Sequence, residues 1–474
     1  MRRRALSLAF AFVVILSATV FYLSFVPSSS CGKMVGQTKV SKFDLLNQHF
    51  GGVTKFRLPG NKFPNGITTL SDGSVWFGEQ SVPGLAHLYS NGTMLEYAWP
   101  FTYSPSATSI WGVVQWNGRI WASDALGGQI VSLDPSNAAL YALKLSEAAA
   151  FPYTITVGSD GALWFTELFV SKIGRIDAQC KLEEFALPQN FGGTPTQIEF
   201  ENGTAGYYLD GGNVSTGLGT LLSFNPKQFS PQPIGGMFNL RAPSSLMVGS
   251  DGIWVAQHSS SAVAFYSFRE DSWVFYPTSP VSYEDTTLPY FVATNGSQVW
   301  FNEHYANRMA LIDTEYSLLT EYSLSNPPVS RIIGIDNALT FSLGAGKAWF
   351  TELTANYVGY VDASYKPTYK ISQVTTSSIK LKPGGNTNLT FTVSGESNSP
   401  ITIQFADTEN VSGRPQRILM TANATEIHSL NGWATVLVNV TAERNLQIGD
   451  YMLLVTFTDG LINQGAYLKL DVTS

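Results

Sequence analysis

A repeat with a period in the mid-forties constrains this chain more than any other feature of its sequence. An aromatic residue, followed three positions later by an acid or an amide, recurs in seven places at intervals of 43 to 49 residues. The aromatic positions are Trp76, Trp121, Trp164, Tyr207, Trp254, Trp300 and Trp349, and the polar positions are Glu79, Asp124, Glu167, Asp210, Gln257, Glu303 and Glu352. Four short antiparallel strands with their turns need about this length, and such units stack radially. The repeat therefore predicts a seven-bladed β-propeller.

Each copy of the repeat also carries the signals of individual strands. In six copies an Asn-Gly or Asp-Gly pair, such as Asp160-Gly161, stands shortly before the aromatic residue. These pairs supply the positive φ angles that a two-residue hairpin needs. Segments such as "SKIGRID" (171–177) and "LEEFALP" (182–188) then predict a third and a fourth strand. A further strand-like segment, "TKFRLPG" (54–60), precedes the first copy. We expect it to pair with the seventh copy and close a ring over residues 53–374.

The composition agrees with an extracytoplasmic all-β protein. The 474 residues are 44% apolar and only 13% charged, and they include 42 glycines. The net charge is −7, and no basic cluster occurs beyond the extreme N-terminus. This charge argues against a nucleic acid as partner.

The N-terminus predicts a membrane anchor. Three arginines precede 22 uncharged residues, Ala5 to Val26, which is long enough to cross about 30 Å of hydrocarbon. A cleaved signal peptide is the alternative, although its apolar core usually spans about 7 to 15 residues. We therefore expect residues 1–30 to form one transmembrane helix, residues 31–52 a linker, and the rest of the chain to lie on the extracytoplasmic side of the cell membrane, with secretion after cleavage as the alternative.

The chain has two cysteines, Cys31 and Cys180. The "VPSSS" before Cys31 lacks the leucine and small residue expected ahead of a lipidated cysteine. A disulfide between the two would join the linker to the ring. We favour two free thiols over this disulfide.

Beyond Val374 the aromatic repeat stops. About six or seven alternating strand-like segments, including "PITIQFAD" and "GDYMLLVTFTDG", occupy roughly 100 residues. Residues 375–474 are therefore predicted to form an immunoglobulin-like β-sandwich. Eight Asn-x-Ser/Thr sequons are candidates for glycosylation, although Asn-rich sequences also form them by chance; they lie at Asn91, Asn202, Asn213, Asn295, Asn388, Asn410, Asn423 and Asn439.

Two of the five histidines fall on one frame of the repeat. His258 and His304 each stand four residues after the tryptophan, in adjacent copies. The first strand begins and the second strand ends at the same edge of a blade, so these histidines are expected to be neighbours at one mouth of the ring. An imidazole can act as a general base or bind a metal, which makes both histidines candidate catalytic residues. The candidate ligand-binding residues at this mouth are Tyr153, Gln257, Tyr290 and Glu303.

The recurring carboxylates need a different explanation, because a group repeated in six copies is more often structural than functional. We expect those of the first four copies to accept hydrogen bonds from the backbone of the next loop. Glu303 and Glu352 are the candidate metal ligands, for Mg²⁺ or another divalent cation. No fixed metal-ligand spacing is present, so the chain otherwise predicts no cofactor.

One copy of the repeat resembles a known family. The stretch "FPYTITVGSDGALWFTELFVSKIGRID" (151–177) is similar to a blade of the streptogramin B lyases (virginiamycin B lyases), and the likeness covers about residues 53–374. The resemblance implies a seven-bladed propeller and an elimination that opens a cyclic depsipeptide, with a histidine base and a magnesium ion held by glutamates. The family's histidines follow a proline at the start of a blade. Here that place is taken by Asn65, Tyr153, Thr196, Ser244 and Tyr290, none of which is histidine.

Three functions agree with these features, since a propeller alone does not choose among them. The first is a membrane-anchored surface protein that binds a ligand or partner at the mouth of the ring. The second is a metal-dependent carbon-oxygen lyase, or a hydrolase, at the same mouth. The third is a structural component that packs against cell-envelope proteins.

Overall fold

The structure is a computed structural model that describes residues 31–81, 83–100, 109–201, 205–212, 217–281, 286–326, 338–373, 377–408 and 417–474. These residues form strands and turns, with one turn of 3₁₀ helix at Gln189–Phe191. The described part is therefore all-β, as predicted. The expected membrane anchor (1–30) and the sequons at Asn202, Asn213 and Asn410 lie outside the described residues. No helix within these ranges is long and apolar enough to cross a bilayer.

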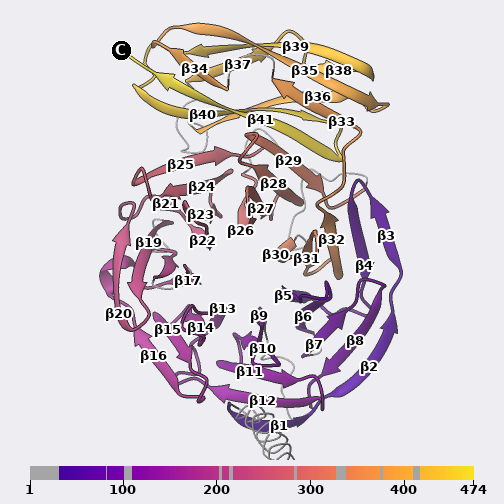
Figure 1. The fold of residues 1–474 in the computed structure, drawn as a ribbon, viewed down its shortest axis with the longest axis vertical. Helices are drawn as coiled ribbons and strands as arrows, with labels where there is room; N and C mark the ends of the chain where they lie inside the picture. The colour runs from indigo at the N-terminus through magenta and orange to yellow at the C-terminus, as the bar shows by residue number, and fades with distance from the viewer. Residues whose placement is uncertain are drawn as a thin grey trace, which may run out of the picture.

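Seven antiparallel sheets surround a central axis in the described part of the chain, and each has its first strand innermost (Figure 1). We name them ring sheets 1 to 7. Ring sheets 1 to 3 consist of β5 (Pro64–Thr69), β6 (Val75–Glu79), β7 (Gly84–Leu88) and β8 (Thr93–Ala98); β9 (Ile110–Trp116), β10 (Arg119–Asp124), β11 (Gln129–Asp134) and β12 (Ala139–Lys144); and β13 (Pro152–Val157), β14 (Leu163–Glu167), β15 (Lys172–Ile176) and β16 (Leu182–Ala186).

Ring sheets 4 to 7 continue this order around the axis. They consist of β17 (Pro195–Phe200), β18 (Gly206–Asp210), β19 (Leu218–Asn225) and β20 (Gln228–Ile234), with β21 (Leu240–Arg241) also on β19; β22 (Pro243–Val248), β23 (Gly252–Gln257), β24 (Ala262–Ser267) and β25 (Ser272–Pro277); β26 (Pro289–Asn295), β27 (Gln298–Glu303), β28 (Arg308–Asp313) and β29 (Leu318–Ser323); and β30 (Ala338–Gly344), β31 (Lys347–Glu352), β32 (Tyr357–Asp362) and β4 (Val53–Arg57).

The recurring aromatic residue holds neighbouring sheets together. It lies on the second strand of each ring sheet and packs into the first two strands of the next sheet. Trp164 of ring sheet 3, for example, contacts Ile198 and Tyr208 of ring sheet 4. Trp300 likewise contacts Phe341 and Phe350 of ring sheet 7. The period of the sequence is thus the spacing at which one large buried side chain must recur to fill each inter-sheet layer.

The ring closes through the strand that precedes the first copy of the repeat. As predicted, β4 pairs antiparallel with β32, from Arg57 opposite Tyr357 to Val53 opposite Val361. The last sheet is therefore built from both ends of the ring sequence, and its hydrogen bonds prevent the ring from opening at this point.

The expected linker at residues 31–52 forms three strands instead. β3 (Asn47–Phe50) pairs with β4, β2 (Lys39–Asp44) with β8, and β1 (Lys33–Gln37) with β12. The segment wraps around the outside of ring sheets 7, 1 and 2 and adds one outer strand to each (Figure 1). Its short strands alternate only weakly between apolar and polar residues, which is why the sequence pattern did not reveal them.

The prediction of free thiols is wrong. Cys31 and Cys180 form a disulfide, with their Cα atoms 4.9 Å apart. Because β1 lies along ring sheet 2, it brings Cys31 to the edge of ring sheet 3, where Cys180 lies in the turn between β15 and β16. The bond therefore fixes the N-terminal wrap to the third sheet.

The C-terminal residues form two sheets packed face to face over one apolar core. One sheet has the order β33 (Tyr369–Gln373), β35 (Asn386–Ser397), β39 (Leu430–Ala442) and β37 (Ile418–Ala422). The facing strands are β34 (Ser378–Leu381), β41 (Ile462–Val472), β40 (Gly449–Thr458), β36 (Ile401–Asp407) and β38 (Glu426–Ile427). Side chains of both sheets, Phe391 and Phe457 among them, share the core.

This unit is continuous with the ring. β41 pairs antiparallel with β29, the outer strand of ring sheet 6, from Leu318 opposite Ala466 to Tyr322 opposite Ile462. One nine-stranded sheet thus runs from the central axis through ring sheet 6 into the C-terminal unit (Figure 1). The sequence predicted a ring over residues 53–374 followed by a sandwich over residues 375–474, and backbone hydrogen bonds between β29 and β41 join these two parts.

Candidate functional site

The backbone register defines one mouth of the ring. In every ring sheet the residue that begins the first strand, or lies next to its start, pairs with the polar residue that ends the second strand. Pro152 lies opposite Glu167, Pro243 opposite Gln257 and Pro289 opposite Glu303. The remaining pairs are Pro64 with Glu79, Ile110 with Asp124, Pro195 with Asp210 and Ala338 with Glu352. The recurring polar residues therefore lie on one rim, as the strand order predicted.

A strained turn leads into four of the seven first strands. Phe63, Phe151, Ala242 and Leu288 each precede a proline and have φ between 41° and 53°. Positive φ is uncommon outside glycine, and the residue before a proline normally adopts an extended conformation. A register shift follows each of these prolines. Such bulges re-aim side chains and are frequent beside functional sites.

The bulges place two tyrosines in contact across the ring. The hydroxyl of Tyr153, on ring sheet 3, is hydrogen-bonded to the hydroxyl of Tyr290, on ring sheet 6. Two other sheets lie between them in chain order, so the bond spans the central channel. Trp111 packs on Tyr153 with ring centroids 5.0 Å apart. The indole Nε1 of Trp111 is buried and has no hydrogen-bond partner among the described residues.

Both histidines lie beside this tyrosine pair, as the sequence predicted. The backbone N–H of His258 donates to the carbonyl of Ala242, and that of His304 to the carbonyl of Leu288, so the strained turns hold both in place. The His258 Nε2 and His304 Nδ1 atoms are 3.3 Å apart. The ring of Tyr290 lies 4.9 Å from that of His258 and 5.8 Å from that of His304.

Burial keeps this histidine pair uncharged at neutral pH. It lowers the pKa of His258 to about 4, helped by the neighbouring His304, and it also lowers the pKa of His304. Burial raises the pKa of Tyr290 to about 12 and that of Tyr153 well above its ordinary value. The four side chains therefore present hydrogen-bonding groups without formal charge. We call Tyr153, Tyr290, His258 and His304 the mouth cluster.

Acidification is expected to destabilise the fold through His258. In the unfolded chain this histidine takes up a proton near pH 6.5, whereas the folded protein takes it up only near pH 4. Its contribution to stability is therefore complete above pH 6.5 and is lost as the pH falls towards 4, by up to about 3 kcal/mol. His87, whose pKa burial also lowers to about 4, adds to the effect.

The measurement is urea unfolding of the wild type and His258→Gln at several pH values. Between pH 6 and 4 the variant should lose stability less steeply, by up to about 1.4 kcal/mol per pH unit. His428→Gln is the matched control, since the side chain of His428 is 88% exposed. Parallel curves for the wild type and His258→Gln would contradict the assignment.

The recurring polar residues fall into two groups. Asp124 accepts hydrogen bonds from the backbone N–H groups of Ser109 and Gly127, and Asp210 from those of Gly193, Thr194 and Gly212. These two are structural, as expected. Gln257 belongs with them, because its side-chain oxygen accepts the N–H of Arg241.

The glutamates of the repeat lie beside cations instead. Glu79 is 3.7 Å from the Lys62 ammonium. Burial and the nearby Glu184 raise the pKa of the Glu167 carboxyl to about 8, and Lys172, directly opposite Glu167 on the next strand, opposes this shift. The expectation of backbone hydrogen bonds is thus wrong for Glu79 and Glu167, since neither carboxylate accepts one from a described residue.

The two candidate metal ligands do not fit a metal ion. Glu303 is 3.8 Å from the Arg308 guanidinium, and Glu352 is 2.5 Å from the Lys55 ammonium. A cation already faces each carboxylate, which opposes binding of a second. Among the described residues no group of three or more His, Cys, Asp or Glu side chains is placed to hold a metal. The residues present therefore do not match the magnesium site that the resemblance implies.

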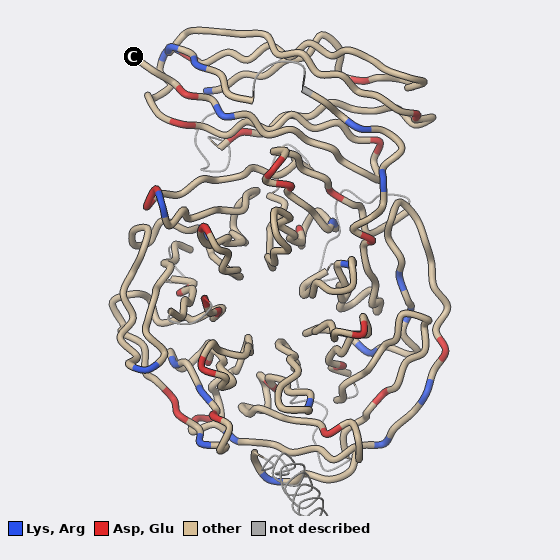
Figure 2. The backbone as a smooth tube through the Cα atoms, viewed as in Figure 1, with Lys and Arg blue, Asp and Glu red and all other residues tan. Residues whose placement is uncertain are grey.

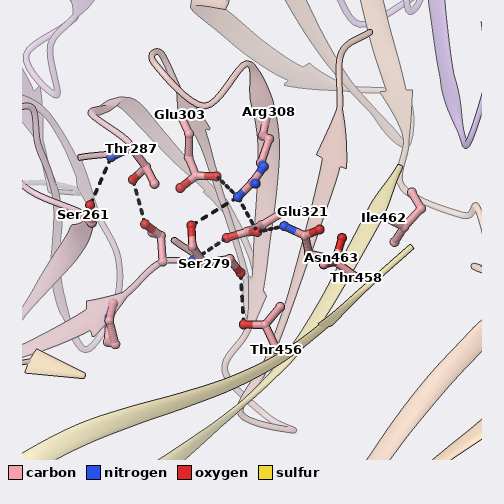
Figure 3. A network of polar contacts seen from close by, with 12 residues as sticks. Ser261, Ser279, Thr287, Glu303, Arg308, Glu321, Thr456, Thr458, Ile462 and Asn463 are labelled. Carbon is pink, nitrogen blue, oxygen red and sulfur yellow. Dashed lines mark hydrogen bonds and ion pairs between the residues drawn. The ribbon is translucent and has the colours of Figure 1, made fainter. Parts of the chain in front are cut away.

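Glu303 instead belongs to a buried network that reaches the C-terminal unit (Figure 3). The Arg308 guanidinium lies 3.1 Å from Glu321 and donates to the carbonyl of Ser279. Asn463 of β41 donates to the same carboxylate of Glu321. Burial and the nearby Glu321 raise the pKa of Glu303, whereas Arg308 lowers it. The network ties the second strand of ring sheet 6 to β41.

Sequence reasoning missed one carboxylate in the channel. The innermost strands of the ring carry almost no charge (Figure 2), and among their described residues Glu199 of β17 is the one Asp, Glu, Lys, Arg or His. Burial raises its pKa to about 7, opposed by hydrogen bonds from Gln197 and Thr156. The lack of other charges in the first strands is the signal that would have identified it.

The sequons in the described part of the chain lie in turns, at the end of a strand or within strands of the C-terminal unit. Asn91 and Asn295 are exposed next to the ends of β8 and β26, on the rim opposite the mouth cluster. Asn388 and Asn423 are exposed on the C-terminal unit. Asn439 is half-buried and donates to the side chain of Asn388. Glycosylation stays a prediction at each of them.

Comparisons with known proteins agree on the ring. Residues 36–209 match the model of the virginiamycin B lyase family. A virginiamycin B lyase from Nocardia farcinica (strain IFM 10152) is 26% identical over 125 residues, which are 26% of this chain and 42% of that protein. The matching region thus spans less than half the length of that relative.

Solved structures extend the likeness to about two thirds of the chain. Virginiamycin B lyase from Staphylococcus aureus superposes with a TM-score of 0.53 at 19% identity, over 68% of this chain and 99% of that chain. A catalytically inactive form of the Staphylococcus aureus enzyme with quinupristin gives a TM-score of 0.52 at 18% identity, with the same coverage. At these identities the likeness concerns the fold.

Proposed function

We propose that this protein, whose ring is similar to the propellers of the virginiamycin B lyases, binds an uncharged ligand at the mouth cluster. We further propose that the ring counts as a seven-bladed propeller and the C-terminal unit as an immunoglobulin-like sandwich, held outside the cytoplasm by an anchor in residues 1–30. The ligand binds where the first strands begin, on the rim that carries His258 and His304.

One observation carries this proposal. Side chains from ring sheets 3, 5 and 6 meet at one point of the channel, and a strained turn leads into the first strand of each of these three sheets. The meeting point is aromatic and hydrogen-bonding, yet it has no formal charge at neutral pH. Polar groups that converge on aromatic surface in a concave site are typical of small-molecule binding. A neutral ligand with a flat apolar face and hydrogen-bonding edges matches this surface best.

Elimination at the same mouth is the second candidate, favoured by the close pair of neutral imidazoles. A neutral histidine can accept a proton from carbon next to a carbonyl group, and the second imidazole, 3.3 Å away, can share it. The low pKa of His258 makes it a weak base, and Glu303 and Glu352 do not provide a metal site. Binding without turnover therefore has the stronger support.

The test is calorimetric titration with quinupristin and with a panel of neutral aromatic amides. Tyr290→Ala is expected to weaken binding at least tenfold, because it removes the ring that contacts both histidines. Tyr316→Ala is the matched control, since Tyr316 is 65% exposed in a distant turn. A set of binders whose affinity does not depend on Tyr290, or a panel without a binder, would contradict the proposal.

Chromatography of the incubated quinupristin separates the two candidate functions. Binding alone leaves its retention unchanged. Ring opening by elimination produces an isomer of the same mass and different retention, whereas hydrolysis adds one water. Product formation that is lost in His304→Ala would favour the lyase.

A further inference from the structure

The outermost strands of the seven ring sheets differ in whether a further strand pairs with their outer edge. Four of them carry an additional strand: β1 lies on β12, β2 on β8, β3 on β4, and β41 on β29. Among the described residues no strand pairs with the outer edges of β16, β20 and β25, in ring sheets 3, 4 and 5. A fifth, outer strand is therefore compatible with the structure of a ring sheet.

Two of the three uncovered edges are protected by their sequence. β16 carries Glu183 and Glu184, which oppose pairing with another strand. β20 carries Pro231 and Pro233, which lack the N–H that a ladder needs. β25, "SWVFYP", has no charged residue and no proline before Pro277. Its edge is therefore the one that remains competent for pairing.

The backbone groups of β25 that face outward follow from its register. The N–H of Thr278 donates to the carbonyl of Ser261, on the side of β24. In an antiparallel ladder the direction alternates, so Phe275 and Trp273 direct their N–H and C=O groups away from β24. The carbonyl of Pro277 follows the same alternation and accepts the hydroxyl of Tyr467.

A cleft of about 970 Å³ lies along this edge. All of residues 272–276 line one wall, and Tyr451 and Met452 of β40 lie in the other. Gln257 also lines it, and its buried Nε2 has no hydrogen-bond partner among the described residues. The charged lining residues balance in sign, being Arg241, Lys469, Glu270 and Asp450.

We propose that this cleft binds an extended segment of a partner protein, which adds to β25 as a fifth strand of ring sheet 5. The segment pairs with the outward groups of Trp273 and Phe275, as β41 pairs with β29 in the adjacent sheet. Its apolar side chains alternate with polar ones, because one face meets the aromatic side chains of the cleft and the other meets solvent. The cleft reaches Gln257, the residue before His258, but none of the four residues of the mouth cluster lines it. The proposal therefore does not depend on the function proposed for that cluster.

The probe is a library of random dodecapeptides displayed on phage and selected on the full chain. Enriched peptides are made synthetically and titrated against the wild type, Phe275→Pro and Phe275→Ala. Both variants lose the ring, but only the proline also removes the outward N–H. We expect Phe275→Pro to bind at least tenfold more weakly than Phe275→Ala.

A second measurement does not depend on the folding of a variant. Methylation of alternate backbone nitrogens of the peptide is expected to abolish binding to the wild type, because the side chains stay and the ladder donors are lost. Equal affinities for Phe275→Pro and Phe275→Ala, or for methylated and parent peptides, would overturn the proposal, as would a library without enriched peptides. Dimerisation of the wild type that Phe275→Pro abolishes would assign the edge to a second copy of this chain and overturn the choice of a partner protein.

Discussion

Cys180→Ser is expected to lower the free energy of unfolding by about 5 kcal/mol under oxidising conditions. The disulfide joins residues 149 positions apart, and closing so long a loop removes much conformational entropy from the unfolded chain. Urea unfolding followed by tryptophan fluorescence measures the change. In the variant, β1 should also detach from ring sheet 2 before the rest of the ring unfolds.

Two matched controls remove the same disulfide in other ways. The double variant, Cys31→Ser with Cys180→Ser, and the reduced wild type should both match the single variant, because all three lack one covalent link. If reduction leaves the midpoint of the wild type unchanged, the link does not stabilise the native ring.

Arg308→Met is expected to cost about 3–5 kcal/mol, because it leaves two buried carboxyl groups without their shared cation. Glu303 and Glu321 are each 1% exposed, and both lie within 4 Å of the Arg308 guanidinium. Burial already raises the pKa of Glu303, so the folded state holds its proton more tightly than the unfolded state. The contribution of Glu303 to stability is therefore lost as the pH rises, and the cost of Arg308→Met should be greater at pH 8 than at pH 5.

Arg175→Met provides the control. Arg175 also lies between two carboxylates, Asp160 at 2.8 Å and Glu183 at 3.0 Å, but these two side chains are 19% and 32% exposed, whereas those of Glu303 and Glu321 are fully buried. Solvent screens ion pairs whose carboxylates are partly exposed, so this variant should lose much less stability than Arg308→Met, and by a similar amount at both pH values. Similar losses in the two variants would show that burial of the Arg308 network is not what stabilises it.

The ring could be predicted from sequence because its constraints are local and repeated. Each copy holds its own hairpin turn and its own buried aromatic residue, and even the closing strand at residues 54–60 resembles the strands that it joins. The convergence of His258 and His304 followed from the same geometry, since the end of a second strand always meets the start of a first.

The features that escaped prediction are pairings between distant, unrepeated segments. The three strands of residues 33–50, the disulfide and the pairing of β41 with β29 each join stretches whose partners leave no local signal. The contact between Tyr153 and Tyr290 is of the same kind, because it depends on two bulges that only the folded ring brings face to face.

The closing strand also determines when this protein can fold during its synthesis. β4 ends at Arg57, and its partner β32 is complete only at Asp362. At about 5–20 residues per second, a ribosome needs roughly 15–60 s to make the residues between them. The side chain of Phe56 is only 1% exposed in the folded protein. Throughout that interval it lacks the residues of the last ring sheet that pack against it. The incomplete ring must therefore be protected from aggregation in the cell until its last strand has left the ribosome.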